Sequence, residues 1–206
     1  MKGTIHAVDL LFDWRMLTDQ AIPKWVRGRQ LCGLAGYGNM NKLPAEEETM
    51  AKATFGAGCF WGVESAFREL KGVTDAAVGY MGGTLANPTY QDVCTDRTGH
   101  AEVVQLDYDP QQISYEQLLR AFFDLHDPTT LNRQGPDYGK QYRSVIFFHD
   151  AEQERAAQKI KDELDRAGRF PRKIVTQIVP ASDFWRGEEY HQRYFEKHGI
   201  AACRTH

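Results

Sequence analysis

The stretch Ala53-Thr54-Phe55-Gly56-Ala57-Gly58-Cys59-Phe60-Trp61-Gly62 changes from one structural period to another within ten residues. Its first half is a short apolar run that ends in glycine, which predicts a strand over Ala53–Ala57. From Phe60 to Leu70 the apolar residues recur at helical spacing, which predicts a helix. Cys59 therefore stands where a strand passes into a helix, and the rest of the chain continues this alternation.

Local signals mark the later elements. Ser114 and Gln117 form a capping-box pair ahead of one helix, and Asp150 caps another that Gly168 ends. The order of the core elements is β-α-β-β-α-β, which predicts an α+β fold with the ferredoxin-like split arrangement, a two-layer α/β sandwich with helices on one face of an open sheet. Beyond the opening strand and helix we expect strands at 74–80, 101–108, 142–148 and 174–179, and helices at 115–125, 151–167 and 188–197.

The first fifty residues differ from the remainder. They lack clear capping signals and contain a glycine-rich run and the acidic run Glu46-Glu47-Glu48, which are typical of loops and linkers. We expect residues 1–50 to be a loosely packed N-terminal extension, residues 51–206 to be the catalytic domain, and the end of the chain to be a tail. A start at Met40 or Met50 is a further hypothesis.

Composition excludes several partners. A formal net charge of -3 over 206 residues gives no general attraction to nucleic acid or anionic lipid. No apolar run approaches the roughly 20 residues that span a bilayer. Asp9 and Asp13 interrupt the apolar residues near the N-terminus, so a secretory signal is not expected. We expect a cytoplasmic protein with no nucleic-acid or membrane partner.

The four cysteines form no C-x-x-C pair, which disfavours thioredoxin-like motifs and zinc ribbons. In a reducing compartment Cys32 and Cys94 are expected to be buried apolar residues. The seven histidines are dispersed, so we expect no metal and no cofactor.

Cys59 admits two interpretations from its local sequence. The unpaired N–H groups at a helix start carry partial positive charge, so they could lower the pKa of the thiol into or below the physiological range and create a nucleophile. Gly56 and Gly58 would permit the turn and leave the sulfur uncovered. Cys59 could equally be a buried turn residue, with Phe60 and Trp61 as ordinary core aromatics.

Gly58-Cys59-Phe60-Trp61-Gly62 resembles the signature of the peptide methionine sulfoxide reductase A family. Four further runs resemble motifs of that family, in its order, and the resemblance covers residues 53 to 203. The runs are Asn87-Pro88-Thr89-Tyr90, Thr98-Gly99-His100-Ala101-Glu102-Val103, Asp137-Tyr138-Gly139-Lys140-Gln141-Tyr142-Arg143-Ser144 and Tyr190-His191-Gln192. The resemblance implies reduction of methionine S-sulfoxide to methionine, free or in oxidised proteins, with thioredoxin as reductant.

The resemblance also implies roles for individual residues. Cys59 would be the nucleophile and Glu102 the proton donor, although alternation along 101–108 alone favours a solvent-facing glutamate. Asp137 would help to organise the polar groups. The hydroxyls of Tyr90 and Tyr142 would bond the sulfoxide oxygen, and Phe60 and Trp61 would form the pocket for the S-methyl group.

Cys203 resembles the C-terminal cysteine that resolves the sulfenic acid of the nucleophile in this family. It follows His191 by 203 − 191 = 12 residues. The sequence departs from the family here, with Ala-Ala-Cys in place of the usual Gly-Tyr-Cys. His100 and His191 are expected to be structural hydrogen-bonding residues.

Two other functions are compatible with parts of this pattern. A peroxidase or cysteine hydrolase would also use a reactive thiol, but a hydrolase would need a histidine paired with Cys59 and an oxyanion hole. A non-catalytic domain that binds oxidised methionine and senses redox state is the other alternative. Turnover would separate it from an enzyme.

Overall fold

The computed structural model describes residues 50–200, which form a six-stranded mixed sheet with strand order β7-β6-β1-β3-β2-β8 and a separate two-stranded hairpin, β4-β5. The strands are β1 (Ala51–Ala57), β2 (Val73–Met81), β3 (Ala101–Tyr108), β4 (Arg133–Gln134), β5 (Asp137–Tyr138), β6 (Ser144–Phe148), β7 (Gln177–Pro180) and β8 (Trp185–Arg186). The helices are α1 (Phe60–Arg68), α2 (Tyr90–Cys94), α3 (Tyr115–Asp124), the 3-10 helix η1 (Lys140–Tyr142), α4 (Ala151–Arg166) and α5 (Tyr194–Lys197).

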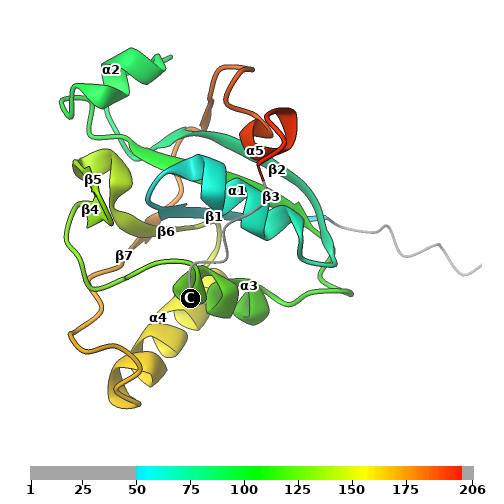
Figure 1. The fold of residues 1–206 in the computed structure, drawn as a ribbon. Helices are drawn as coiled ribbons and strands as arrows, with labels where there is room; N and C mark the ends of the chain where they lie inside the picture. Colours follow the sequence, from blue (N-terminus) through cyan, green and yellow to red (C-terminus); the bar gives the residue numbers. More distant parts are fainter. Residues whose placement is uncertain (1–49, 201–206) are drawn as a thin grey trace, which may run out of the picture. The chain divides into compact units, whose positions relative to one another are not determined.

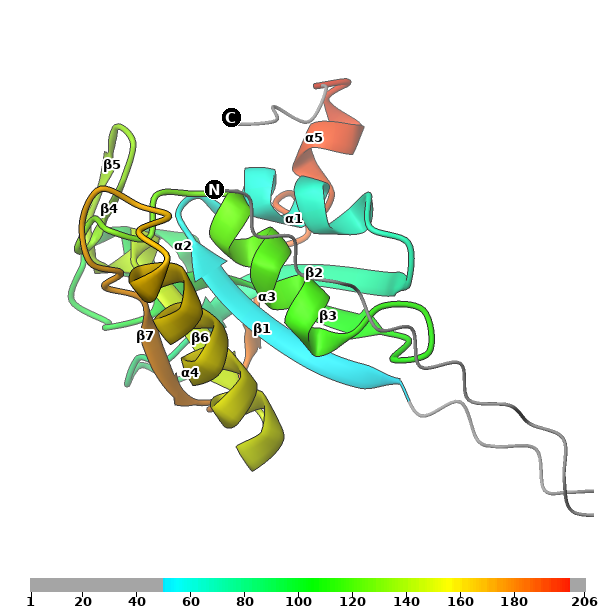
Figure 2. The ribbon, with the colours of Figure 1, turned by 90° about the horizontal axis from the view of Figure 1, so that it is seen from below.

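The central four strands have the predicted split topology. β1 pairs antiparallel with both β3 and β6, and β2 pairs antiparallel with β3. With α1 after β1 and α3 after β3, this is the ferredoxin-like β-α-β-β-α-β arrangement, so the predicted fold class is confirmed. α4 crosses over to β7, which pairs parallel with β6, and β8 extends the other edge beside β2. Figures 1 and 2 show α1, α3 and α4 on the same face of the sheet.

The main core lies between the sheet and these three helices. Phe55 of β1 stacks on Phe67 of α1 and on Phe122 of α3, with ring centroids 5.3 and 5.2 Å apart. A smaller apolar cluster covers part of the opposite face, where Val103 and Phe147 are buried. β3 is therefore covered on both faces over its first half, and all four residues from Ala101 to Val104 are buried.

Most predicted elements are confirmed, but some boundaries are wrong. The strand expected at 174–179 begins only at Gln177. The strand expected at 142–148 begins at Ser144, because Lys140–Tyr142 turns as a 3-10 helix. The last helix is expected at 188–197 but comprises only Tyr194–Lys197, because Arg193 before it adopts a left-handed conformation with φ 51°. Sequence patterns did not reveal the short elements α2, β4, β5 and β8. No helix within residues 50–200 is long and apolar enough to cross a membrane.

Candidate active site

Cys59 occupies the N-cap position of α1, directly after β1. The turn into the helix requires glycine at position 58, where φ is +92° and a Cβ atom would lie 2.7 Å from Cγ of Gln134. The side chain of Gln134 bonds both N–H and C=O of Asp127, so the loop that carries β4 and β5 packs closely on this turn. The predicted strand-to-helix placement of Cys59 is confirmed.

The surroundings of Cys59 oppose ionisation of its thiol. Burial of the sulfur raises the pKa of the thiol to about 11, and negative charge on Glu102 and Asp137 adds to the rise. The backbone N–H groups of Trp61 and Gly62 at the start of α1 lower the pKa, but by less than burial raises it. The expectation of a pKa at or below the physiological range is therefore wrong for the protein alone, because loss of water outweighs the helix N-terminus.

Glu102 is buried beside this helix start. It lies on the helix-covered face of β3 with an exposed fraction of 1 %, so the solvent-facing position that alternation favoured is wrong. Its Oε2 accepts the N–H of Phe60 at 3.2 Å, while its Oε1 has no hydrogen-bond partner among the described residues. Burial raises the pKa of the carboxyl to about 8, assisted by the charge of Asp137 and opposed by the Phe60 N–H. Glu102 is thus mostly protonated at neutral pH and has an oxygen free to act.

The electrostatic coupling of Cys59 and Glu102 predicts how alkylation depends on pH. Only the thiolate reacts with iodoacetamide, so the rate at Cys59 is expected to rise about tenfold per pH unit through neutral pH and to level off near pH 11. Glu102 is ionised above about pH 8 and its charge disfavours the thiolate. In Glu102→Gln that charge is absent, so the midpoint is expected to fall. Mass spectrometry of the Cys59 peptide measures both profiles, and equal midpoints would contradict the coupling.

The other predicted polar residues gather around Glu102. Tyr90 begins α2, Tyr142 ends η1, and Asp137 begins β5. Burial and the charge of Glu102 raise the pKa of both tyrosines, that of Tyr142 to about 12, so both hydroxyls remain protonated donors at neutral pH. The charge of Asp137 acts in turn on Cys59, Glu102 and Tyr142. Four separate segments of the chain therefore meet at this site.

An aromatic cluster adjoins the polar groups and is defined by Phe60, Trp61, Tyr90, Tyr190 and His191. The ring of His191 lies at its centre, 5.1 Å from Phe60, 4.6 Å from Tyr90 and 4.1 Å from Tyr190 between centroids. Of the two residues predicted to form the methyl pocket, Phe60 is buried and Trp61 is half-buried, so it is Trp61 that keeps apolar surface exposed near Cys59.

Tyr80 and Glu188 also contribute to this cluster, and the sequence patterns indicate neither of them. The hydroxyl of Tyr80 in β2 donates to Oε2 of Glu188 at 2.9 Å, and the N–H of Tyr90 donates to Oε1 of Glu188 at 2.8 Å. Burial disfavours the charged carboxyl of Glu188, but these donors hold its pKa below the usual range. The partners lie about a hundred positions away in the chain, so no local spacing could have indicated them.

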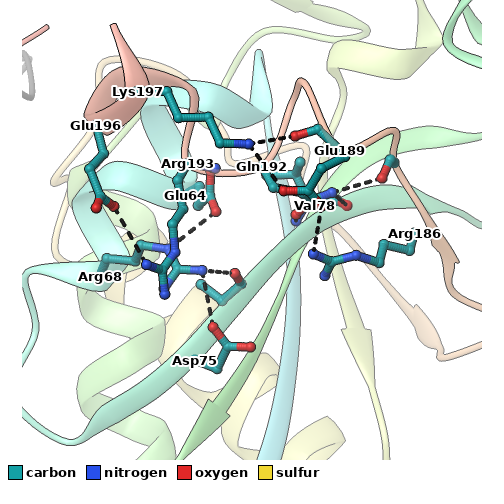
Figure 3. A network of polar contacts seen from close by, with 12 residues as sticks. Glu64, Arg68, Asp75, Val78, Arg186, Glu189, Gln192, Arg193, Glu196 and Lys197 are labelled. Atoms are coloured by element: carbon teal, nitrogen blue, oxygen red, sulfur yellow. Dashed lines mark hydrogen bonds and ion pairs between the residues drawn. The ribbon is translucent and has the colours of Figure 1, made fainter. Parts of the chain in front are cut away.

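The two residues that follow His191 are anchored to β2 and α1. The amide of Gln192 accepts from Val78 N–H at 3.0 Å and donates to Val78 C=O and to Gly187 C=O. The N–H of Arg193 donates to Oε2 of Glu64, which is buried in α1 and bonded to Arg68. Figure 3 shows these contacts joining the last part of the chain to β2 and α1.

Of the other cysteines, Cys94 lies beside the tyrosines of the site, where its thiol is hydrogen-bonded to the hydroxyl of Tyr90, and the other two lie outside the described residues. Cys94, at the end of α2, is exposed, so its expected burial is wrong. α2 lies in a loop excursion between β2 and β3 and buries only Val93. Cys32 and the predicted resolving residue Cys203 lie outside the described residues. His100 is a structural hydrogen-bonding residue as predicted, accepting from Gly83 N–H and bonding the C=O of Leu85.

Comparison with known proteins identifies the family. The model of the family described as peptide methionine sulfoxide reductase matches residues 51–206. The peptide methionine sulfoxide reductase MsrA of Acidobacterium capsulatum is 69% identical over 154 residues, which cover 75% of this chain and 99% of that protein.

Solved structures agree with this relationship. The reduced form of Mxr1 from Saccharomyces cerevisiae matches with a TM-score of 0.72 and 35% identity, over 81% of this chain and 96% of that one. Mxr1 in complex with Trx2 matches with a TM-score of 0.51 and 28% identity, over 75% and 91% of the two chains. The chain, in which a cysteine at a helix start faces a buried glutamic acid, belongs to the peptide methionine sulfoxide reductase A family and is an enzyme that reduces methionine sulfoxide.

Proposed function

We propose that Cys59 is the nucleophile of this reductase and that Glu102 supplies the proton which the sulfoxide oxygen gains. The observation that carries the proposal is the protonated, 1 % exposed carboxyl of Glu102, with one oxygen unpartnered, beside the sulfur of Cys59. A buried carboxyl with a raised pKa is suited to donate a proton near neutral pH.

The chemistry balances with these two groups. The sulfur of Cys59 bonds to the sulfoxide sulfur as the oxygen takes a proton from Glu102. The hydroxyl then moves to the sulfur of Cys59 as the substrate S–O bond and the new S–S bond break, which leaves methionine and a cysteine sulfenic acid. The sulfoxide sulfur is reduced by two electrons and the cysteine sulfur is oxidised by two. Since the thiol is protonated at neutral pH, its proton must also leave, and the carboxylate of Glu102 can accept it.

The neighbouring residues fix the sulfoxide for this reaction. The hydroxyls of Tyr90 and Tyr142 donate hydrogen bonds to its oxygen. The negative charge of Asp137 raises the pKa of Glu102 and so helps to keep its carboxyl protonated. Phe60 and Trp61 form the apolar wall for the S-methyl group. With the oxygen donors on one side and this wall on the other, the site accepts the S epimer, free or in an oxidised protein chain.

Reset of the enzyme requires a second thiol and an external reductant. Cys203 attacks the sulfenic acid of Cys59, which forms a disulfide and releases water. Thioredoxin then reduces the disulfide, a step supported by the relative Mxr1, whose structure was solved in complex with Trx2. A reducing compartment such as the cytoplasm suits this cycle, because thioredoxin is kept reduced there.

A two-reductant assay tests the function as a whole. The wild-type chain is given each epimer of a blocked methionine sulfoxide separately, with dithiothreitol or with the thioredoxin system, and methionine is measured by chromatography. Turnover of the S epimer with both reductants and no turnover of the R epimer are expected. Reduction of both epimers at equal rates would refute the chiral site, and binding without turnover would favour the redox-sensor alternative.

The Cys203→Ser variant is expected to separate the two halves of the cycle. Dithiothreitol can reduce the sulfenic acid of Cys59 directly, so activity with dithiothreitol is retained. Thioredoxin needs a disulfide to attack, so thioredoxin-driven turnover is expected to fall by more than about tenfold. The matched control is Cys32→Ser, which removes a thiol outside the residues that match the family. Full thioredoxin-driven turnover in Cys203→Ser would refute the resolving role.

A further inference from the structure

His191 is the most enclosed polar side chain of the aromatic cluster. Its exposed fraction is 1 %, and its ring contacts Phe60, Tyr90 and Tyr190. Burying a polar ring is costly unless its nitrogens are used, so each nitrogen of His191 must be accounted for.

The hydrogen bond to Trp61 fixes the tautomer of His191. The indole Nε1–H of Trp61 donates to Nδ1 of His191 at 3.0 Å. An indole nitrogen can only donate, so Nδ1 carries no proton and the neutral ring carries its proton on Nε2. Nε2 has no hydrogen-bond partner among residues 50–200, and the closest carboxylate oxygen, Oε2 of Glu188, lies 3.9 Å away. The negative charge of Glu188 favours the proton on that nitrogen.

The backbone that carries His191 is fixed independently of its ring. Gln192 is bonded to β2 through both atoms of its amide, and the N–H of Arg193 is bonded to the buried carboxylate of Glu64 in α1 (Figure 3). His191 thus presents its Nδ1 from a segment held to two elements of the core. Such a rigid support is what a positioning residue requires.

Trp61 is held on two sides. One face of its ring stacks on Tyr194 of α5, with centroids 3.8 Å apart and planes 7° apart. Stacking sets the plane of the indole but leaves the ring free to slide within that plane. The hydrogen bond from its Nε1–H to Nδ1 of His191 fixes the position of the indole edge that carries Nε1. We propose that His191 is a positioning residue that holds the edge of Trp61 and so fixes the apolar wall for the S-methyl group. This inference rests on the proposed function of Trp61 in that wall.

Two substitutions at position 191 test the proposal. His191→Leu removes the acceptor and keeps an apolar side chain, so the indole is expected to move and KM for the sulfoxide to rise about three- to tenfold, with kcat little changed. His191→Asn places an amide oxygen near the position of Nδ1 and is expected to restore KM. The matched control is His149→Leu, which removes a histidine bonded to Thr54, outside the cluster, and is expected to leave KM unchanged.

The ¹⁵N NMR signal of the Trp61 indole, assigned with Trp61→Phe, reports the bond without any turnover. It is expected to shift in His191→Leu, to return towards the wild-type position in His191→Asn, and to stay in place in His149→Leu. Absence of sulfoxide reduction by the wild type would reject the proposed function and leave this readout intact. An unshifted indole signal and unchanged KM in folded His191→Leu, or an Asn variant identical to the Leu variant, would overturn the positioning role.

A measurement on the wild type covers the case in which His191→Leu does not fold. The ¹⁵N signals of the His191 ring are expected to show an unprotonated Nδ1 and a protonated Nε2 at neutral pH. A proton on Nδ1 would overturn the proposal, because the ring could not then accept from Trp61.

Discussion

The Cys59→Ser variant is expected to reduce methionine sulfoxide at least about 1000-fold more slowly than the wild type, even with dithiothreitol in excess. A serine hydroxyl cannot take the sulfoxide oxygen, because the product would contain a weak O–O bond in place of a sulfenic acid. The change is small in volume and lies at an N-cap, where serine is favoured, so the fold should be kept.

The measurement for Cys59→Ser is the release of methionine from the S epimer, followed by chromatography under single-turnover and steady-state conditions. Single turnover matters because it needs no resolving step and reports the attack alone. Cys32→Ser is the control, since it makes the same chemical change at a cysteine outside the residues that match the family. A single turnover at wild-type rate in Cys59→Ser would remove Cys59 from the reaction altogether.

The Glu102→Gln variant is expected to lower kcat/KM by about 100- to 1000-fold, which lies within the roughly 100- to 10,000-fold that a general acid contributes. The amide can still accept the N–H of Phe60, as Oε2 does now at 3.2 Å, so the helix start is not disturbed. It cannot give up a proton, so the sulfoxide oxygen must be protonated from water. The amide is neutral, as the protonated carboxyl of Glu102 is at neutral pH, so the substitution changes no buried charge.

Two further variants distinguish the effect of losing the Glu102 proton from the effect of changing the side chain. Glu116→Gln is the control, because Glu116 on α3 forms an exposed ion pair with Lys159 on α4, and neither residue belongs to the site. Glu102→Asp keeps an ionisable carboxyl but shortens the side chain by one methylene group, which moves the proton away from the substrate. A loss of kcat/KM between wild type and Glu102→Gln is therefore expected. A Glu102→Gln variant within about threefold of wild type would fall far short of a general-acid effect and would assign proton donation to another group.

Local signals in the sequence were sufficient for most of the fold. The capping box of Ser114 and Gln117 forms as predicted, and the strand expected at 101–108 is β3 to the residue. These features depend on neighbours within a few positions. The last helix was placed too early because Gln192 is pulled into bonds with β2, a contact across 114 positions that no periodicity reports.

For the candidate site too, local sequence predicts some features, while others depend on the completed fold. The position of Cys59 at a helix start follows from local sequence, but the pKa of its thiol depends on how deeply the completed fold buries the sulfur. The inward position of Glu102 depends on a sheet covered on both faces. Tyr80 and Glu188 were missed because their bond joins β2 to a turn near the end of the chain.

The bond between Val78 and Gln192 has a consequence for how the protein is made. At about 5–20 residues per second, a ribosome adds the 114 positions between these partners in roughly 6 to 23 seconds. During that interval the residues of β1, α1 and β2 are already synthesised, yet Glu188, His191 and Gln192 do not exist to close the aromatic cluster. A growing chain thus carries the thiol of Cys59 well before the aromatic cluster that adjoins it is complete.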